Sequence, residues 1–141
     1  MNIKQFMPKF LKELRSGNWD QATGNLIKKV NLFDGNKISY CVIGVACKVA
    51  GAKDIDLVNR ERPDEVYGCD DWGQPDYPDY IKFKELFEYS GSNKTNVFFT
   101  YDRISDLIDL NDDDQDGYDK WSFKSLADEI EYLYDGWKEE V

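Results

Sequence analysis

Apolar residues recur at the spacing of an α-helix near both ends of the chain. The first set is Ile3, Phe6, Met7, Phe10, Leu11 and Leu14. Pro8 interrupts this set, so we expect the regular helix to start near Pro8 and to end at Gly17. The second set is Phe123, Leu126, Ala127, Ile130, Leu133, Tyr134 and Trp137. It predicts a long final helix, with Ser122 or Asp119 as the residue that caps its first turn.

The sequence pattern of residues 26–50 predicts a hairpin followed by a buried helix. Residues 26–33 and 37–42 flank Asp34-Gly35, a pair typical of two-residue hairpin turns. From residue 40 to residue 50 only Lys48 is charged, and several residues are small. We interpret 40–50 as a buried helix that is entered from a strand and ends at Gly51, although its apolarity also describes a central strand.

The remaining segments complete an α+β fold. They are a long loop over 54–77, a helix over 78–89, a strand over 96–101, a short helix over 105–110 and an acidic loop over 111–119. No repeat or linker divides the chain. We therefore expect residues 1–141 to form a single compact domain, in which a small antiparallel hairpin or sheet is packed by four or five helices.

Charge and composition exclude several classes of function for this chain. The chain has 18 basic and 28 acidic residues, a net charge of −10, and no histidine. Histidine-dependent nucleophiles, bases and metal ligands are thereby excluded, and a basic groove for nucleic acid or anionic lipid is disfavoured. The 10 basic and 5 acidic residues of 1–60 give +5, and the 8 basic and 23 acidic residues of 61–141 give −15. The acidic excess is therefore concentrated in the second half.

Cysteine usage and the absence of long apolar runs suggest a cytoplasmic protein. No run reaches the ~20 residues of a membrane span, and the first residues lack the apolar core of a secretory signal. Cys41, Cys47 and Cys69 have no metal-type spacing. We expect buried free thiols without a disulfide between Cys41 and Cys47. Cys41 lies near a strand-to-helix junction, which favours thiolate formation, but its apolar neighbours favour a structural role.

One motif resembles a calcium-binding loop. Asp112, Asp114, Asp116 and Gly117 match the opening of an EF-hand loop. The pattern fails where a bidentate glutamate is needed, because Phe123 stands there. Any calcium affinity should therefore be millimolar or absent, and we predict no metal and no cofactor. A solvated acidic loop is the interpretation we favour.

The acidic residues of the second half form another candidate site. They are Asp109, Asp112, Asp113, Asp114, Asp116 and Asp119, with Asp128, Glu129, Glu131, Asp135, Glu139 and Glu140. Carboxylates at phosphate-like spacing can occupy a basic groove that normally binds nucleic acid. The alternative is a surface kept soluble by its charge.

Three blocks of sequence together resemble an uncharacterised family of small phage and prophage proteins. The blocks are Leu14-Arg15-Ser16-Gly17 with Gln21 and Gly24, then Tyr40-Cys41-Val42-Ile43-Gly44-Val45 with Cys47, and finally residues 107–112 with Ser122-Phe123, Ala127-Asp128 and Ile130-Glu131. The resemblance implies a viral accessory protein that acts in a bacterial cytoplasm. It implies no catalytic residue.

The function we expect is a non-enzymatic phage-encoded binder that inhibits or redirects a host factor, for host takeover or against host defence. The partner would be a host protein with a basic surface, including one that itself binds nucleic acid; direct binding of nucleic acid or membrane is not expected. The predicted contact residues are Asp112, Asp113, Asp114, Asp116, Tyr118, Asp119, Trp121, Glu131 and Asp135.

Two alternatives remain open. One is a protein that sequesters a nucleotide signal, for which Arg15, Arg60, Arg62 or Arg103 would converge on phosphate. The other is a carboxylate-based hydrolase that uses Asp70-Asp71 in the long loop.

Overall fold

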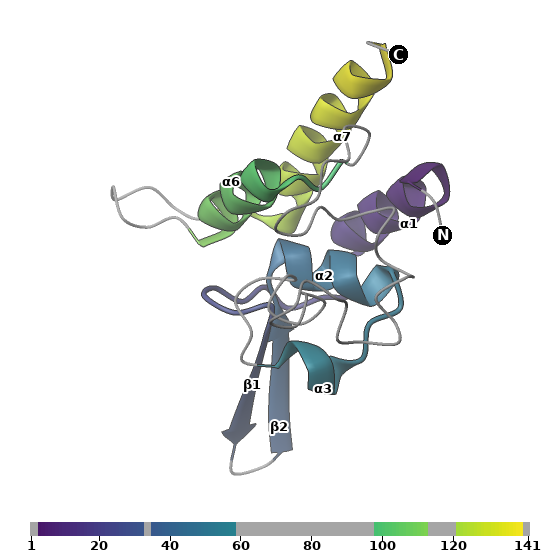
Figure 1. The fold of residues 1–141 in the computed structure, drawn as a ribbon. Helices are drawn as coiled ribbons and strands as arrows, with labels where there is room; N and C mark the ends of the chain where they lie inside the picture. The colour runs from purple at the N-terminus through teal and green to yellow at the C-terminus, as the bar shows by residue number, and fades with distance from the viewer. Residues whose placement is uncertain (1–2, 33–34, 59–97, 113–120, 140–141) are drawn as a thin grey trace, which may run out of the picture.

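The computed structural model describes residues 3–32, 35–58, 98–112 and 121–139. Its elements are α1 (Ile3–Ser16), β1 (Ile27–Leu32), β2 (Gly35–Tyr40), α2 (Val42–Val49), α3 (Asp54–Leu57), α6 (Tyr101–Asp112) and α7 (Phe123–Glu139). Figure 1 shows α1, α6 and α7 on one side of α2, with the hairpin of β1 and β2 extending from its other side. The fold is α+β with a two-stranded antiparallel sheet, as predicted.

Helix α1 begins earlier than predicted. Its first residue is Ile3, so Pro8 lies inside the helix, and the expected start near Pro8 is wrong. A proline at this position leaves the carbonyl of Lys4 without an N–H partner. Both Lys4 and Pro8 are exposed, so water can bond that carbonyl. The burial of Phe6 and Met7 in the core extends the helix over these first turns.

The hairpin is confirmed, with its turn displaced by one residue. The register joins Ile27 to Tyr40 at the open end and Leu32 to Gly35 at the tip. The chain therefore reverses between Leu32 and Gly35, whereas the sequence pattern placed Asp34 and Gly35 together in the turn. Gly35 has a φ of 142°, a backbone conformation that disfavours residues with a Cβ atom.

The buried helix predicted after the hairpin is α2, which is central to the fold. Cys41 precedes its first residue, and the Cys41 Sγ atom accepts a hydrogen bond from the backbone N–H of Gly44 at 3.3 Å. A Cβ atom at Gly44 would overlap the carbonyl oxygen of Leu26, so only glycine allows this approach of α2 to the chain that enters β1. Gly51 follows the helix with a φ of 108°, consistent with the predicted stop.

Helix α6 replaces the end of a predicted strand. The strand expected over 96–101 is wrong at its described end, because α6 begins at Tyr101 and continues to Asp112, beyond the helix predicted over 105–110. Phe98 and Phe99 are fully buried, with their rings packed edge to face at 5.0 Å. Thr100 Oγ1 accepts a hydrogen bond from the N–H of Arg103 at 3.2 Å and so caps the first turn. Phe99 also occupies an isolated bridge position, so the strand-like composition of this segment coincides with burial and one bridge rather than with a described strand.

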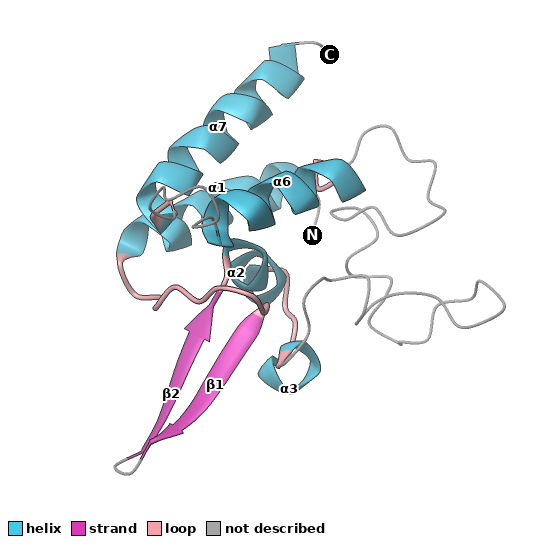
Figure 2. Ribbon diagram, turned by 90° about the vertical axis from the view of Figure 1, so that its left-hand side faces the viewer, coloured by secondary structure: helices cyan, strands magenta, loops and turns pink. Residues whose placement is uncertain are grey.

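The final helix confirms its predicted stripe and its cap. Phe123, Leu126, Ala127, Ile130 and Tyr134 are buried, and the N–H of Ser125 donates to Ser122 Oγ at 3.2 Å. Figure 2 shows α7 crossing α6 and α1 above α2. Buried residues of α1, β1, α2, α3, α6 and α7 belong to one apolar cluster. These elements therefore share a core.

Several predictions lie outside the described residues. They are most of the loop over 54–77, the helix over 78–89, and the acidic loop beyond Asp112. At the described start of that first loop, residues 54–57 form the short helix α3 instead. Within the described ranges, no helix is both long enough and apolar enough to cross a membrane.

Candidate functional site

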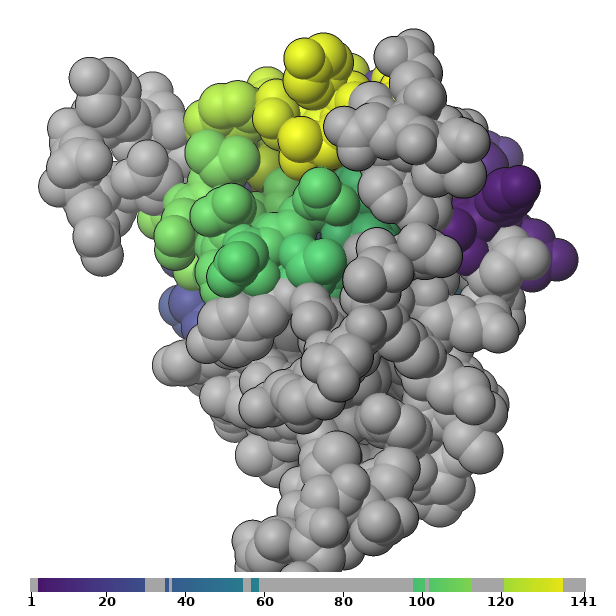
Figure 3. Space-filling view, turned by 45° about the horizontal axis from the view of Figure 1, so that its top comes forward, coloured from purple at the N-terminus to yellow at the C-terminus, as the bar shows by residue number. Residues whose placement is uncertain are grey.

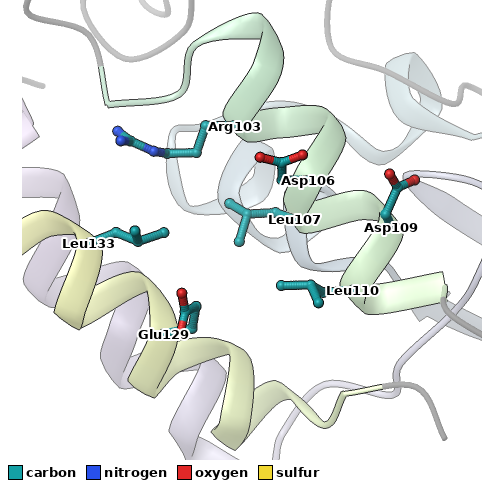
Figure 4. Close-up of a pocket in the computed structure, with 7 residues that line it drawn as sticks. All are labelled: Arg103, Asp106, Leu107, Asp109, Leu110, Glu129 and Leu133. Carbon is teal, nitrogen blue, oxygen red and sulfur yellow. The ribbon is translucent and has the colours of Figure 1, made fainter. Parts of the chain in front are cut away.

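A groove of about 460 Å³ lies between α6 and α7. Its lining residues are Arg103, Asp106, Leu107, Asp109 and Leu110 from α6, with Glu129 and Leu133 from α7. Figure 4 shows the side chains of Leu107, Leu110 and Leu133 in the space between the two helices, with Asp106 and Glu129 beside them and Asp109 farther along α6. The groove therefore has an apolar floor and a rim that is mainly acidic.

Helical spacing produces this arrangement. Asp106 and Asp109 are three residues apart and lie on one side of α6. Leu107 and Leu110 have the same spacing and turn toward α7, where Leu107 is buried and Leu110 half-buried. The two helices lie side by side on the face shown in Figure 3. Each helix therefore contributes both leucine and carboxylate to the groove.

The rim carboxylates lack an ion-pair partner among the described residues. The ion pairs found there join Arg15 to Asp128 and Glu131, and Lys48 to Asp54; Asp106, Asp109 and Glu129 take part in none of them. Three carboxylates and one guanidinium line the groove, so its side chains carry 1 − 3 = −2. A cation that enters the groove meets uncompensated negative charge.

Arg103 is directed toward the core rather than to these acids. Its Nη1 atom donates to the carbonyl of Phe98 at 2.9 Å, and its guanidinium lies 4.5 Å from the centre of the Phe98 ring. Burial lowers the pKa of the Arg103 guanidinium, and the charge of Asp106 partly opposes this effect. Arg103 therefore closes one end of the groove without neutralising Asp109 or Glu129.

The opposite side of α7 holds two of the predicted contact residues. Arg15 Nη2 bonds Asp128 Oδ1 at 2.9 Å and Glu131 Oε2 at 2.8 Å, which links α1 to α7. These hydrogen bonds raise the pKa of Arg15. Asp135 is exposed and lies one turn beyond Glu131. The structure therefore separates the acids of α7 into a groove face with Glu129 and an outer face with Glu131 and Asp135.

A buried asparagine joins the C-terminal end of α6 to the rest of the fold. Asn111 Oδ1 accepts from Gln21 Nε2 at 3.0 Å and from the N–H of Val42, the first residue of α2, at 3.1 Å. Its Nδ2 donates to the carbonyl of Ala22 and to Asp112 Oδ1, both at 2.7 Å. Asn111 is fully buried and makes four hydrogen bonds, so it is a structural residue.

Asp112 belongs to this same network. While one carboxylate oxygen accepts from Asn111, Oδ2 accepts from the N–H of Gly24 at 3.1 Å. Both oxygens of this predicted contact residue are thus used within the chain. Of the calcium candidates, Asp114 and Asp116 lie outside the described residues, where Asp113, Tyr118 and Asp119 also fall. The described part of the chain contains no cluster of potential metal ligands.

Trp121 is exposed, as a contact residue would be. Trp121 is 37% exposed. Its backbone N–H donates to the Leu110 carbonyl at 3.1 Å, and its backbone carbonyl accepts from Gln21 Nε2 at 2.7 Å. Tyr132, on the outer part of α7, is 75% exposed. The backbone of Trp121 is therefore held in place while its ring faces solvent.

The two thiols that the structure describes are structural, while Cys69 lies outside the described residues. Cys41 and Cys47 are both free and buried, as predicted. Burial raises the pKa of Cys41 to about 12, although the Gly44 N–H at the start of α2 lowers it, and burial also raises the pKa of Cys47. Desolvation outweighs the helix terminus, so neither thiol is prepared for nucleophilic attack.

The residues of the two alternative functions are only partly described. Arg15 and Arg103 each bind groups within the chain, while Arg60, Arg62, Asp70 and Asp71 lie outside the described residues. Asp106 was absent from the predicted contacts. Its spacing from Asp109, on a helix whose leucines repeat with the same interval, is the signal that could have identified it.

Comparison with known proteins adds no assignment. No protein-family model, curated protein or solved structure matches this chain.

Proposed function

We propose that this chain is a phage-encoded, non-enzymatic accessory protein that binds a basic surface of a host protein and thereby blocks or redirects it. In this proposal the chain is one α+β domain with four or five helices. The observation that carries the proposal is the groove between α6 and α7, which has a leucine floor and carboxylates that form no ion pair with any residue the structure describes.

Such a groove suits an arginine or lysine side chain of the partner. The long aliphatic part of either side chain can pack on Leu107, Leu110 and Leu133, while its charged end reaches the carboxylates. Arginine fits best, because its planar guanidinium can bond two carboxylate oxygens at once. An acidic surface without the leucines would attract the charged end of the side chain but would give its aliphatic part nothing apolar to pack on.

Long-range charge also favours a basic partner. The net charge of −10 attracts positive surfaces and repels nucleic acid and anionic lipid. Attraction of this kind mainly accelerates association and selects partners, whereas the groove would determine how long the complex lasts.

The experiment compares two triple variants of the chain. The groove variant carries Asp106→Asn, Asp109→Asn and Glu129→Gln. The matched control carries Asp20→Asn, Asp102→Asn and Asp135→Asn, which remove the same charge from exposed carboxylates that form no ion pair with any described residue. The tagged wild-type chain captures partners from a bacterial lysate, and the dissociation constant of each purified partner is then measured with all three proteins at low and high salt.

We expect the groove variant to weaken binding by about tenfold or more, and the control by about threefold or less. Raised salt should weaken the wild-type complex. Equal losses in both variants would show that only net charge matters. A loss confined to the control would place the contact outside the groove and would contradict the groove proposal.

A further inference from the structure

A second pocket, of about 400 Å³, is lined mainly by basic and aromatic side chains. Its lining residues are Lys9, Lys12 and Glu13 of α1, Trp19, and Lys48 and Val49 of α2. Helices α1 and α2 lie next to one another in Figure 1. All six residues belong to the half of the sequence that carries +5, a feature that the proposed partner binding does not use.

Two ammonium groups of this pocket are available to a ligand. Lys9 and Lys12 are three residues apart on one face of α1, are exposed, and form no ion pair with any other described residue. Lys48 differs from them, because its Nζ atom lies 2.7 Å from Asp54 Oδ1. Lys9 and Lys12 are therefore the two pocket lysines whose charge no described ion pair offsets, and Glu13 adds one carboxylate to the lining.

The indole of Trp19 forms a fixed aromatic wall. Its Nε1 atom donates to Glu13 Oε2 at 2.8 Å, which holds the indole by one edge. The ring also packs against Tyr40 in an edge-to-face arrangement, with centroids 4.7 Å apart and planes at 82°. Trp19 is half-buried, so part of it remains accessible. A ring held in this way loses little conformational freedom when a ligand stacks on it.

We infer that this pocket binds a nucleoside phosphate, with the phosphates at Lys9 and Lys12 and the base against Trp19. Lysine binds phosphate as a point charge, and aromatic side chains stack on bases of any sequence. The volume lies within the usual range for small-ligand pockets, about 300–1,000 Å³. The site differs from the arginine cluster that the sequence suggested, since Arg15 and Arg103 are bound elsewhere.

Calorimetric titration of the purified full chain at fixed salt tests this inference. The ligands are adenosine 5′-diphosphate, inorganic phosphate, adenosine and a short oligoglutamate peptide. The test variant carries Lys9→Gln and Lys12→Gln. Its matched control carries Lys28→Gln and Lys29→Gln, which remove the same charge from exposed positions of β1. A third variant, Trp19→Leu, removes the aromatic wall.

The diphosphate should bind at least about tenfold more tightly than phosphate or adenosine alone, because only it uses both parts of the pocket. The Lys9/Lys12 variant should bind the diphosphate about tenfold more weakly, while the Lys28/Lys29 control should change the affinity for the diphosphate by about twofold or less. Trp19→Leu should remove the preference for the diphosphate over inorganic phosphate.

Four outcomes would overturn the inference. They are no binding of the diphosphate at millimolar concentration, equal affinity for phosphate and the diphosphate, equal losses in the two lysine variants, or tighter binding of the oligoglutamate peptide. The last would assign the pocket to an acidic protein segment. No partner protein takes part, so the result is independent of the proposed function.

Discussion

The side chain of Asn111 connects the end of α6 to residues 21–22 and to the start of α2. It bonds Gln21, Ala22, Val42 and Asp112, and it is fully buried. Its amide is suited to this position because it supplies two acceptor sites and two donors on a short side chain. A carboxylate would supply no donor for the Ala22 carbonyl, and an apolar residue would supply neither group.

We predict that Asn111→Leu lowers the free energy of unfolding by about 3 kcal/mol or more, since it leaves the Val42 N–H and the Ala22 carbonyl buried without partners. Urea denaturation measures this change. Asn18→Leu is the matched control, because Asn18 is exposed, and it should change stability by less than about 0.5 kcal/mol. Similar effects of the two substitutions would show that the network adds little.

At the scale of the element, the start of α7 depends on a short cap. The Ser122 hydroxyl accepts from the N–H of Ser125 at 3.2 Å and also lies 3.2 Å from the Ser125 hydroxyl. We predict that Ser122→Ala lowers the free energy of unfolding by about 1 kcal/mol, through loss of the cap. Ser125→Ala keeps the backbone bond and should have less than half of that effect. Chemical denaturation of both variants checks the prediction.

Periodicity in the sequence was enough to predict the elements that bury one continuous stripe. Helix α7 was found in this way, whereas the hairpin was found from its Asp34-Gly35 turn signal and α2 from its lack of charge. The errors occur where tertiary burial overrides local preference. Burial of Phe6 and Met7 extends α1 past Pro8, and Phe98 and Phe99 have strand composition but fill the core beside α6.

At the scale of the whole molecule, the sequence predicted acidity but not which acids share a face. Glu129 and Glu131 lie on the same helix but have different neighbours. Glu129 lines the groove beside α6, and Glu131 forms an ion pair with Arg15 of α1. The groove joins helices separated in the sequence by residues 113–120, and the basic pocket joins α1 to the end of α2. Because these distances along the chain exceed any local pattern, neither site could be derived from spacing alone.

The response of the fold to alkaline pH should originate in the buried thiols of Cys41 and Cys47 together with Tyr40, whose pKa burial also raises. Burial raises the pKa of Cys41 from 9.0 to about 12, and the pKa of Cys47 is raised as well. A thiol whose pKa is raised in the folded state contributes its full stabilisation of the fold at pH values below its pKa in the unfolded chain. Above that value only the unfolded chain loses the proton, so stability falls as pH rises toward the folded pKa.

We therefore predict that the free energy of unfolding declines between the unfolded and folded pKa values of Cys41, by roughly 1 kcal/mol per pH unit for each buried thiol. Cys41→Ser keeps a side chain that can cap α2 but removes one titrating group, so its decline should be shallower by roughly 1 kcal/mol per pH unit. Urea denaturation of both proteins from neutral pH to pH 11 measures the two slopes, where pH 11 is roughly one unit below the folded pKa. Parallel curves would mean that Cys41 ionises equally well in the folded chain, and that its burial does not control the alkaline limit of the fold.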